Sequence, residues 1–114
     1  MDISSASFAF AALSQPIRLE VFRLLVATGP TGLAAGEIAD VLAMKQNTMS
    51  ANLAVLLRAG LISNERDGRS IVYRANVAAM AALINFMLQD CCGGKPESCS
   101  AALQSIFPQP VCEC

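Results

Sequence analysis

The chain has 114 residues, a net charge of −1 and a hydrophobic content of 54%, with a mean hydropathy of +0.50. This length suits one domain and excludes two ordinary ones, and so large an apolar share favours burial against a second copy of the chain, with scattered core alanines as the alternative. The longest uncharged stretches, residues 75–89 and 98–112, fall short of the ~18–20 residues that a membrane span requires, and no basic secretory leader opens the chain, so we expect a cytoplasmic protein.

The amino-terminal part is predicted to be helical. Residues 5–13 form a short apolar helical segment. Pro16 suits the first turn of the next helix, with Ser14 or Gln15 as its cap. Apolar side chains then recur with the spacing of one helical face, at Ile17, Val21, Leu24 and Leu25.

Two further helices follow a break at Gly29 and Pro30. Residues 34–44 form a short helix that presents Ile38 and Leu42 to the core. Residues 45–61 contain the next helix, for which Asn47 is a candidate cap and Gly60 a typical terminating residue. Its expected buried stripe consists of Met49, Leu53, Leu56 and Leu57.

Residues 61–74 are predicted to form a β-hairpin, because two β-prone arms flank Asp67 and Gly68, a favoured tight-turn pair. Asn76 then caps a helix over residues 77–92. The apolar face of that helix carries Met80, Leu83, Ile84, Met87 and Leu88. The expected fold is therefore mainly α with a small β-hairpin, and two helices that meet near residue 44 before a hairpin describe a winged helix-turn-helix.

Three consecutive blocks, ALSQPIRLEVFRLL, GEIADVLAMKQNTMSANLAVLLRAGLI and RDGRSIVYRAN, resemble the ArsR family of metalloregulatory repressors over about residues 10–92. The resemblance implies a homodimer formed through the first and last helices, residues 5–13 and 77–92. It also implies binding to double-stranded operator DNA and release when a thiophilic metal or metalloid binds. Residues 1–92 would be the DNA-binding and dimerisation domain, and residues 93–114 a cysteine-rich sensor tail. A transcriptional repressor of this kind is not an enzyme.

The segment from Lys45 to Arg74 holds five basic and two acidic side chains, which favours nucleic acid as the partner. In a winged helix-turn-helix, the amino-terminal residues of the recognition helix face the bases and the wing contacts phosphates. The candidate DNA-binding residues are Lys45, Gln46, Asn47, Thr48, Ser50, Ala51, Asn52, Arg66 and Arg69. The alternative is a solvated hairpin with ordinary surface charge, and for Asn47 the role of helix cap competes with base contact.

All five cysteines lie in the last 24 residues, and the chain contains no histidine. Cys91, Cys92 and Cys99 form the stretch CCGGKPESC, which is similar to the cysteine-bearing ends of arsenic-responsive family members. The family's better-known arsenic site, on the helix before recognition, is absent because LAAGEIADVL has no cysteine. The resemblance therefore implies trivalent arsenic, antimony or methylarsenite as the effector, with no resident cofactor.

Several chemistries remain open for these thiols. Three thiolates suit a soft trivalent centre, and Gly93 and Gly94 would let Cys99 fold back toward the adjacent pair. A redox switch and a structural zinc site are the alternatives, the latter giving a zinc-stapled protein-interaction module. A catalytic thiol is disfavoured because no histidine is available to activate it. Incidental tail thiols are a further alternative, and this is the favoured interpretation of Cys112 and Cys114, which are weaker candidates for a metal site.

Overall fold

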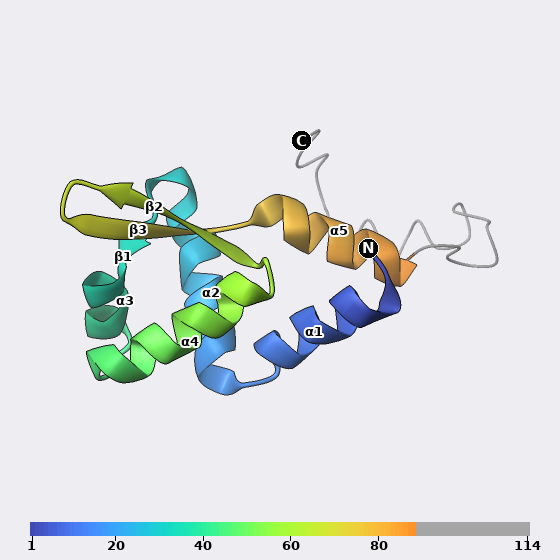
Figure 1. The fold of residues 1–114 in the computed structure, drawn as a ribbon, viewed down its shortest axis with the longest axis horizontal. Helices are drawn as coiled ribbons and strands as arrows, with labels where there is room; N and C mark the ends of the chain where they lie inside the picture. The colour runs from blue at the N-terminus through green and yellow to red at the C-terminus, as the bar shows by residue number, and fades with distance from the viewer. Residues whose placement is uncertain (89–114) are drawn as a thin grey trace.

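The computed structural model describes residues 1–88, and Figure 1 shows their arrangement. Within residues 1–88, five α-helices and three short strands form a winged helix-turn-helix, so the fold class expected from the sequence is confirmed. The helices are α1 (Ile3–Leu13), α2 (Pro16–Thr28), α3 (Ala35–Val41), α4 (Gln46–Arg58) and α5 (Val77–Leu88), with a 3₁₀ turn η1 (Gly29–Thr31) after α2. No helix within this part of the chain combines the length and the apolarity needed to cross a membrane.

Helix α1 begins two residues earlier than the sequence indicates, because Asp2 caps it. The Asp2 carboxylate accepts a hydrogen bond from the Ser5 backbone N–H at 2.8 Å, and the Ser5 hydroxyl accepts one from the Asp2 N–H at 3.1 Å. This reciprocal pair is a capping box. The Ser5 backbone N–H, and then the Ser5 hydroxyl, lower the pKa of Asp2 below its usual value.

Local signals at the other helix ends are partly confirmed. Gln15 caps α2 by accepting from the Arg18 N–H at 3.0 Å, and Asn76 caps α5 by accepting from the Ala79 N–H at 3.1 Å. The cap predicted at Asn47 is wrong, because α4 begins at Gln46 and Asn47 lies inside its first turn. The side chain of Asn47 is instead exposed.

Strand β1 (Leu33–Ala34) pairs with β3 (Ser70–Ala75), which pairs with β2 (Ile62–Asp67), giving an antiparallel sheet of order β1-β3-β2. The hairpin is confirmed, but its turn is centred one residue later than expected. Asp67 pairs with Ser70, so Gly68 and Arg69 are the central residues. Gly68 has a φ of 65° and Arg69 has no positive φ, which is the pattern of a type II′ turn. The two-residue β1 is an addition to the elements expected from the sequence.

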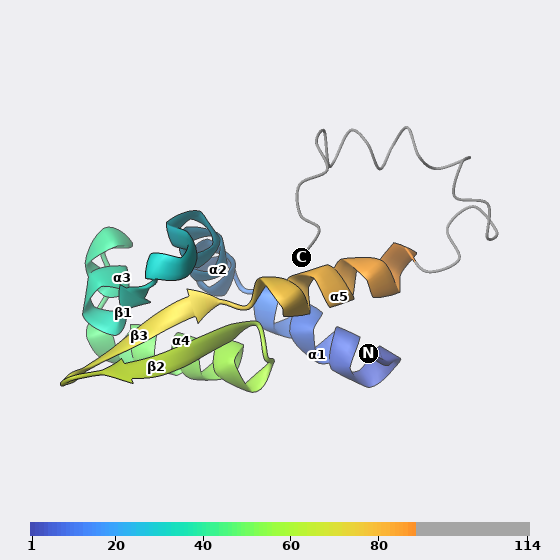
Figure 2. The ribbon, with the colours of Figure 1, turned by 90° about the horizontal axis from the view of Figure 1, so that it is seen from above.

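The core lies where α1, α2 and α4 meet the base of the hairpin. The predicted stripe on α4 is confirmed at Met49, Leu53 and Leu56, while Leu57 is only half-buried. On α2, Val21 and Leu25 are buried, and so is Phe22. The remaining buried apolar residues are Ala6, Ala9, Ala12, Ile38, Ala39, Leu61, Ile62 and Leu83. Figures 1 and 2 show α1 and α5 extending together away from the wing, on the side of the molecule opposite the hairpin tip.

Candidate nucleic-acid interface

The helix-turn-helix consists of α3 and α4, joined by residues 42–45. The N–H groups of Ala43 and Met44 donate to the carbonyls of Asp40 and Ala39 at 3.2 and 2.9 Å, which ends α3 sharply. Helix α4 then packs against α3, α2 and α1. Its opposite face is left as the outward surface of the motif.

The outward surface of α4 is polar at its amino-terminal end. Burial of Met49 and Leu53 turns Asn47 and Ala51 toward solvent, since helical periodicity places them opposite, and Ser50 is also exposed. Gln46 and Thr48 flank this face and are exposed, as is Lys45, the residue at the N-cap position. The first turn carries no acidic side chain, so the positive end of the helix dipole is left uncompensated there, and an anion such as phosphate is favoured.

Asn52 differs from the other candidates because its side chain points inward. It retains only 9% exposure, its Nδ2 donates to the carbonyl of Thr48 at 3.0 Å, and its Oδ1 accepts from Arg18 Nη1 at 3.3 Å. A buried amide with both ends bonded is not available to base edges. Asn52 is therefore excluded from the candidate interface as a correction to the sequence prediction.

The wing supplies two arginines. Arg66 lies on β2 and Arg69 at the hairpin turn, and both side chains are exposed. The acidic residue Asp67 lies between them in sequence and is also exposed. Among the described residues, Lys45, Arg66 and Arg69 are therefore exposed cations of the helix-turn-helix and the wing.

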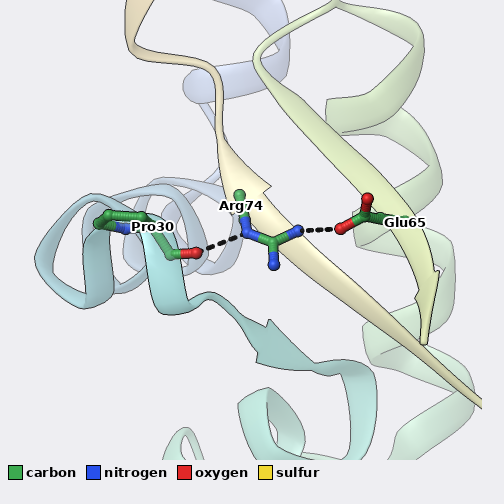
Figure 3. A network of polar contacts seen from close by, with 3 residues as sticks. All are labelled: Pro30, Glu65 and Arg74. Atoms are coloured by element: carbon green, nitrogen blue, oxygen red, sulfur yellow. Dashed lines mark hydrogen bonds and ion pairs between the residues drawn. The ribbon is translucent and has the colours of Figure 1, made fainter.

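Arg74 belongs to the basic segment by sequence but has a structural role. Figure 3 shows its guanidinium between two partners: Nε donates to the Pro30 carbonyl at 2.7 Å, and Nη1 pairs with Glu65 Oε1 at 3.0 Å. The side chain thus connects η1 to both strands of the hairpin. The sequence gives no local indication of this contact, because Pro30 and Arg74 are 44 residues apart.

The predicted thiol site lies outside the described residues, since Cys91, Cys92, Cys99, Cys112 and Cys114 all follow Leu88. Within residues 1–88, no group of three His, Cys, Asp or Glu side chains is arranged to hold a metal ion.

Comparison with known proteins identifies the class of fold and function. Residues 13–64 match a family model described as a helix-turn-helix domain. Over 79 residues the chain is 34% identical to the transcriptional repressor SdpR of Bacillus subtilis (strain 168), covering 69% of this chain and 84% of that protein.

Two solved structures are similar over most of the chain. An ArsR-like transcriptional regulator from Rhodococcus sp. RHA1 has a TM-score of 0.68 at 27% identity, covering 90% of this chain and 92% of the other. The homodimeric winged helix-turn-helix DNA-binding domain of Mb0332 from Mycobacterium bovis, described as a possible ArsR-family regulator, has a TM-score of 0.62 at 31% identity, covering 77% and 82%.

Proposed function

Because this chain belongs to the ArsR family of winged helix-turn-helix transcriptional repressors, we propose that it binds operator DNA as a homodimer and leaves the DNA when a thiophilic metalloid binds its carboxyl-terminal cysteines. Members of this family are DNA-binding regulators and not enzymes.

The proposed DNA surface is supported by the exposure of the polar residues at the amino-terminal end of α4 and of the wing arginines Arg66 and Arg69. Gln46 and Asn47 have amides that can bond bidentately to adenine in the major groove. Ser50 and Thr48 suit phosphates or less selective base contacts. Lys45, Arg66 and Arg69 would hold phosphates, and Ala51 permits close approach of the helix to the base edges.

Exposed apolar side chains on α1 and α5 support the dimer. Ile3, Phe8 and Phe10 on α1 are 71%, 49% and 43% exposed, and Val77 and Met87 on α5 are 55% and 60% exposed. Large apolar side chains gathered on two neighbouring helices favour burial against another protein surface. A dimer of this class reads two half-sites about one DNA turn apart. The homodimeric Mb0332 domain is consistent with this arrangement.

The chemistry of the donor set supports the sensor. Thiolates are the soft ligands among side chains, and a trivalent arsenic or antimony centre accepts three of them. The chain has no histidine, and its only thiolate donors are the five cysteines after residue 90, of which Cys91, Cys92 and Cys99 are the proposed ligands and Cys112 and Cys114 are further candidates. Binding there would act at the end of α5, one of the two helices proposed for the dimer. The effector must bind the DNA-free form more tightly, and DNA must weaken effector binding by the same factor.

Removing the wing arginines tests the DNA surface. We expect Arg66→Ala with Arg69→Ala to weaken operator binding and to flatten its dependence on salt. The slope of the logarithm of the binding constant against the logarithm of the salt concentration should fall in magnitude by about 0.9 for each phosphate that is no longer neutralised. Operator affinity is measured by fluorescence anisotropy between 50 and 200 mM salt, a range over which phosphate-dominated binding changes strongly, by roughly 10³ or more.

The matched control for that experiment removes two other exposed arginines, through Arg23→Ala with Arg58→Ala. This variant has the same net charge as the wing variant, and we expect it to keep the wild-type slope. If the wing variant has an unchanged slope, or if the slope falls equally in both variants, the wing does not contact phosphates.

A further inference from the structure

Arg18 connects three helices. It lies in the first turn of α2, where Nε donates to the carbonyl of Ala12 at 2.7 Å and Nη1 donates to Asn52 Oδ1 at 3.3 Å. Ala12 is in the last turn of α1, where carbonyls have no partner within the helix. Asn52 is on the inner face of α4. One guanidinium therefore binds the end of α1 and the middle of the recognition helix.

Asn52 joins Arg18 to the amino-terminal half of α4, because its side chain bonds both Arg18 and the carbonyl of Thr48. Among residues 1–88 it is the only buried polar or charged residue, and no buried side-chain nitrogen or oxygen there lacks a partner. Its Oδ1 is occupied by Arg18, so its Nδ2 is directed at the carbonyl of Thr48, one turn earlier. Thr48 is itself one of the exposed candidates for DNA contact.

These hydrogen bonds add a constraint that the apolar contacts of α4 lack. Met49, Leu53 and Leu56 hold the helix by burial, which does not depend on direction. Hydrogen bonds weaken steeply when their angle is poor, and those of a guanidinium are charge-assisted and geometrically specific. The hydrogen bonds of Arg18 to Ala12 and Asn52 therefore restrict the rotation of α4 about its own axis and its position relative to α1, while the bond from Asn52 to Thr48 fixes the amide within α4.

We infer that Arg18 is a positioning residue for DNA recognition, which holds α4 through Asn52 in the rotation that presents its outward face to base edges and ties that rotation to α1. The inference rests on the proposed DNA-binding function and adds a residue that does not touch DNA. Because α1 is one of the two helices proposed for the dimer, the same contact links the dimer surface to the recognition helix. A positioning role affects base readout, whereas a phosphate contact affects all sequences alike.

The test compares Arg18→Met with Arg23→Met, which removes an exposed arginine from the same helix. The probes are a duplex selected by the wild-type protein from random DNA and a scrambled duplex of equal length and composition. We expect Arg18→Met, which removes the bonds to both Ala12 and Asn52, to weaken binding to the selected duplex by roughly tenfold, the effect expected from loss of the charge-assisted bond to Asn52. Binding to the scrambled duplex and the salt slope should stay at wild-type values, and Arg23→Met should change neither.

Asn52→Ala provides a second variant that leaves the bond between Arg18 and Ala12 in place. We expect the same selective weakening, and little additional weakening when Arg18→Met and Asn52→Ala are combined, because the two residues act through one contact. This variant carries the test if Arg18→Met fails to fold, as judged by circular dichroism.

Two results would overturn the inference alone. Selective binding at the wild-type level in Arg18→Met, or in Asn52→Ala where only that variant folds, would show that the contact does not position α4. Equal weakening on both duplexes with a reduced salt slope would show that Arg18 contacts phosphate directly. A wild-type protein that selects no duplex would contradict the proposed function, and this inference would fall with it.

Discussion

Ala43 holds a backbone conformation that residues with a side chain rarely adopt, with a φ of 54°. It follows the end of α3 in a Schellman arrangement, at the position where glycine is usual. Helix α4 ends in the same arrangement, where the N–H groups of Gly60 and Leu61 donate to Leu57 and Leu56 at 3.0 and 3.1 Å. Gly60 there has a φ of 76°. The same helix ending thus occurs twice, with alanine at the left-handed position after α3 and glycine at that position after α4.

We predict that Ala43→Gly raises the free energy of unfolding by about 1 kcal/mol, because it removes the clash of Cβ in the left-handed region. The reverse change, Gly60→Ala, should lower the free energy of unfolding by a similar amount, since its added Cβ meets no other atom within 4 Å. Urea denaturation measures both values. A destabilised Ala43→Gly variant would show that the Ala43 methyl group makes a compensating contact.

Single residues differ in how well the sequence predicts their place. Met49, Leu53 and Leu56 follow the helical repeat, so their burial could be predicted from local spacing. Asn52 could not be placed in this way, because its polarity predicts exposure. Its burial depends on Arg18, which lies 34 residues earlier in the chain, and no local pattern contains that contact.

Among the elements, β1 depends on the close approach of the Gly32 backbone to β3. A Cβ built on Gly32 would lie 2.6 Å from the carbonyl oxygen of Tyr73 and 2.8 Å from side-chain atoms of both Val72 and Arg74. Gly32 immediately precedes β1, which pairs with β3 through Leu33 opposite Tyr73. The backbone of β3 therefore passes too near for any side chain at this position.

We predict that Gly32→Ala lowers the free energy of unfolding by about 3 kcal/mol, combining left-handed strain with overpacking against the β3 backbone. Gly60→Ala is the matched control, because it adds the same methyl group at a positive φ in open space and should cost only about 1 kcal/mol. Equal destabilisation of the two variants in urea denaturation would contradict the close approach.

The elements themselves could mostly be predicted because their signals are local. Apolar periodicity, the caps at Gln15 and Asn76, and the β-prone arms of the hairpin each lie within a few residues of one another. Strand β1 could not be predicted because it has two residues and exists only through its pairing with β3, about 40 positions later. The turn is displaced by one residue from its predicted place because Asp-Gly and Gly-Arg both satisfy a two-residue hairpin loop.

At the scale of the whole molecule, the exposed apolar side chains of α1 and α5 predict a homodimer formed through these two helices. We expect Phe8→Glu with Met87→Glu to shift the protein from dimer to monomer, because two charges per chain would have to be buried in the interface. Analytical ultracentrifugation at micromolar concentration measures the change. Val41→Glu, which alters a 61% exposed residue on α3, should remain a dimer. A dimeric double variant would place the interface elsewhere.

The wing and the recognition helix could be assigned from the order of elements and from the family resemblance. The family, the fold and the repressor class are confirmed by the comparisons. The roles predicted for Cys91, Cys92 and Cys99 stay predictions, because these residues follow the described part of the chain. A change from cysteine to serine tests these roles directly, because replacing sulfur with oxygen removes a soft ligand and changes little else.

The most direct test of the account is the effect of trivalent arsenic on operator binding, measured by fluorescence anisotropy under anaerobic, reducing conditions that suppress disulfides. We expect arsenic to release wild-type protein from the operator, and Cys91→Ser, Cys92→Ser and Cys99→Ser each to stay bound. A variant with both Cys112→Ser and Cys114→Ser should still be released. Normal release of all three single variants would contradict the account, because the effector site would then lie elsewhere.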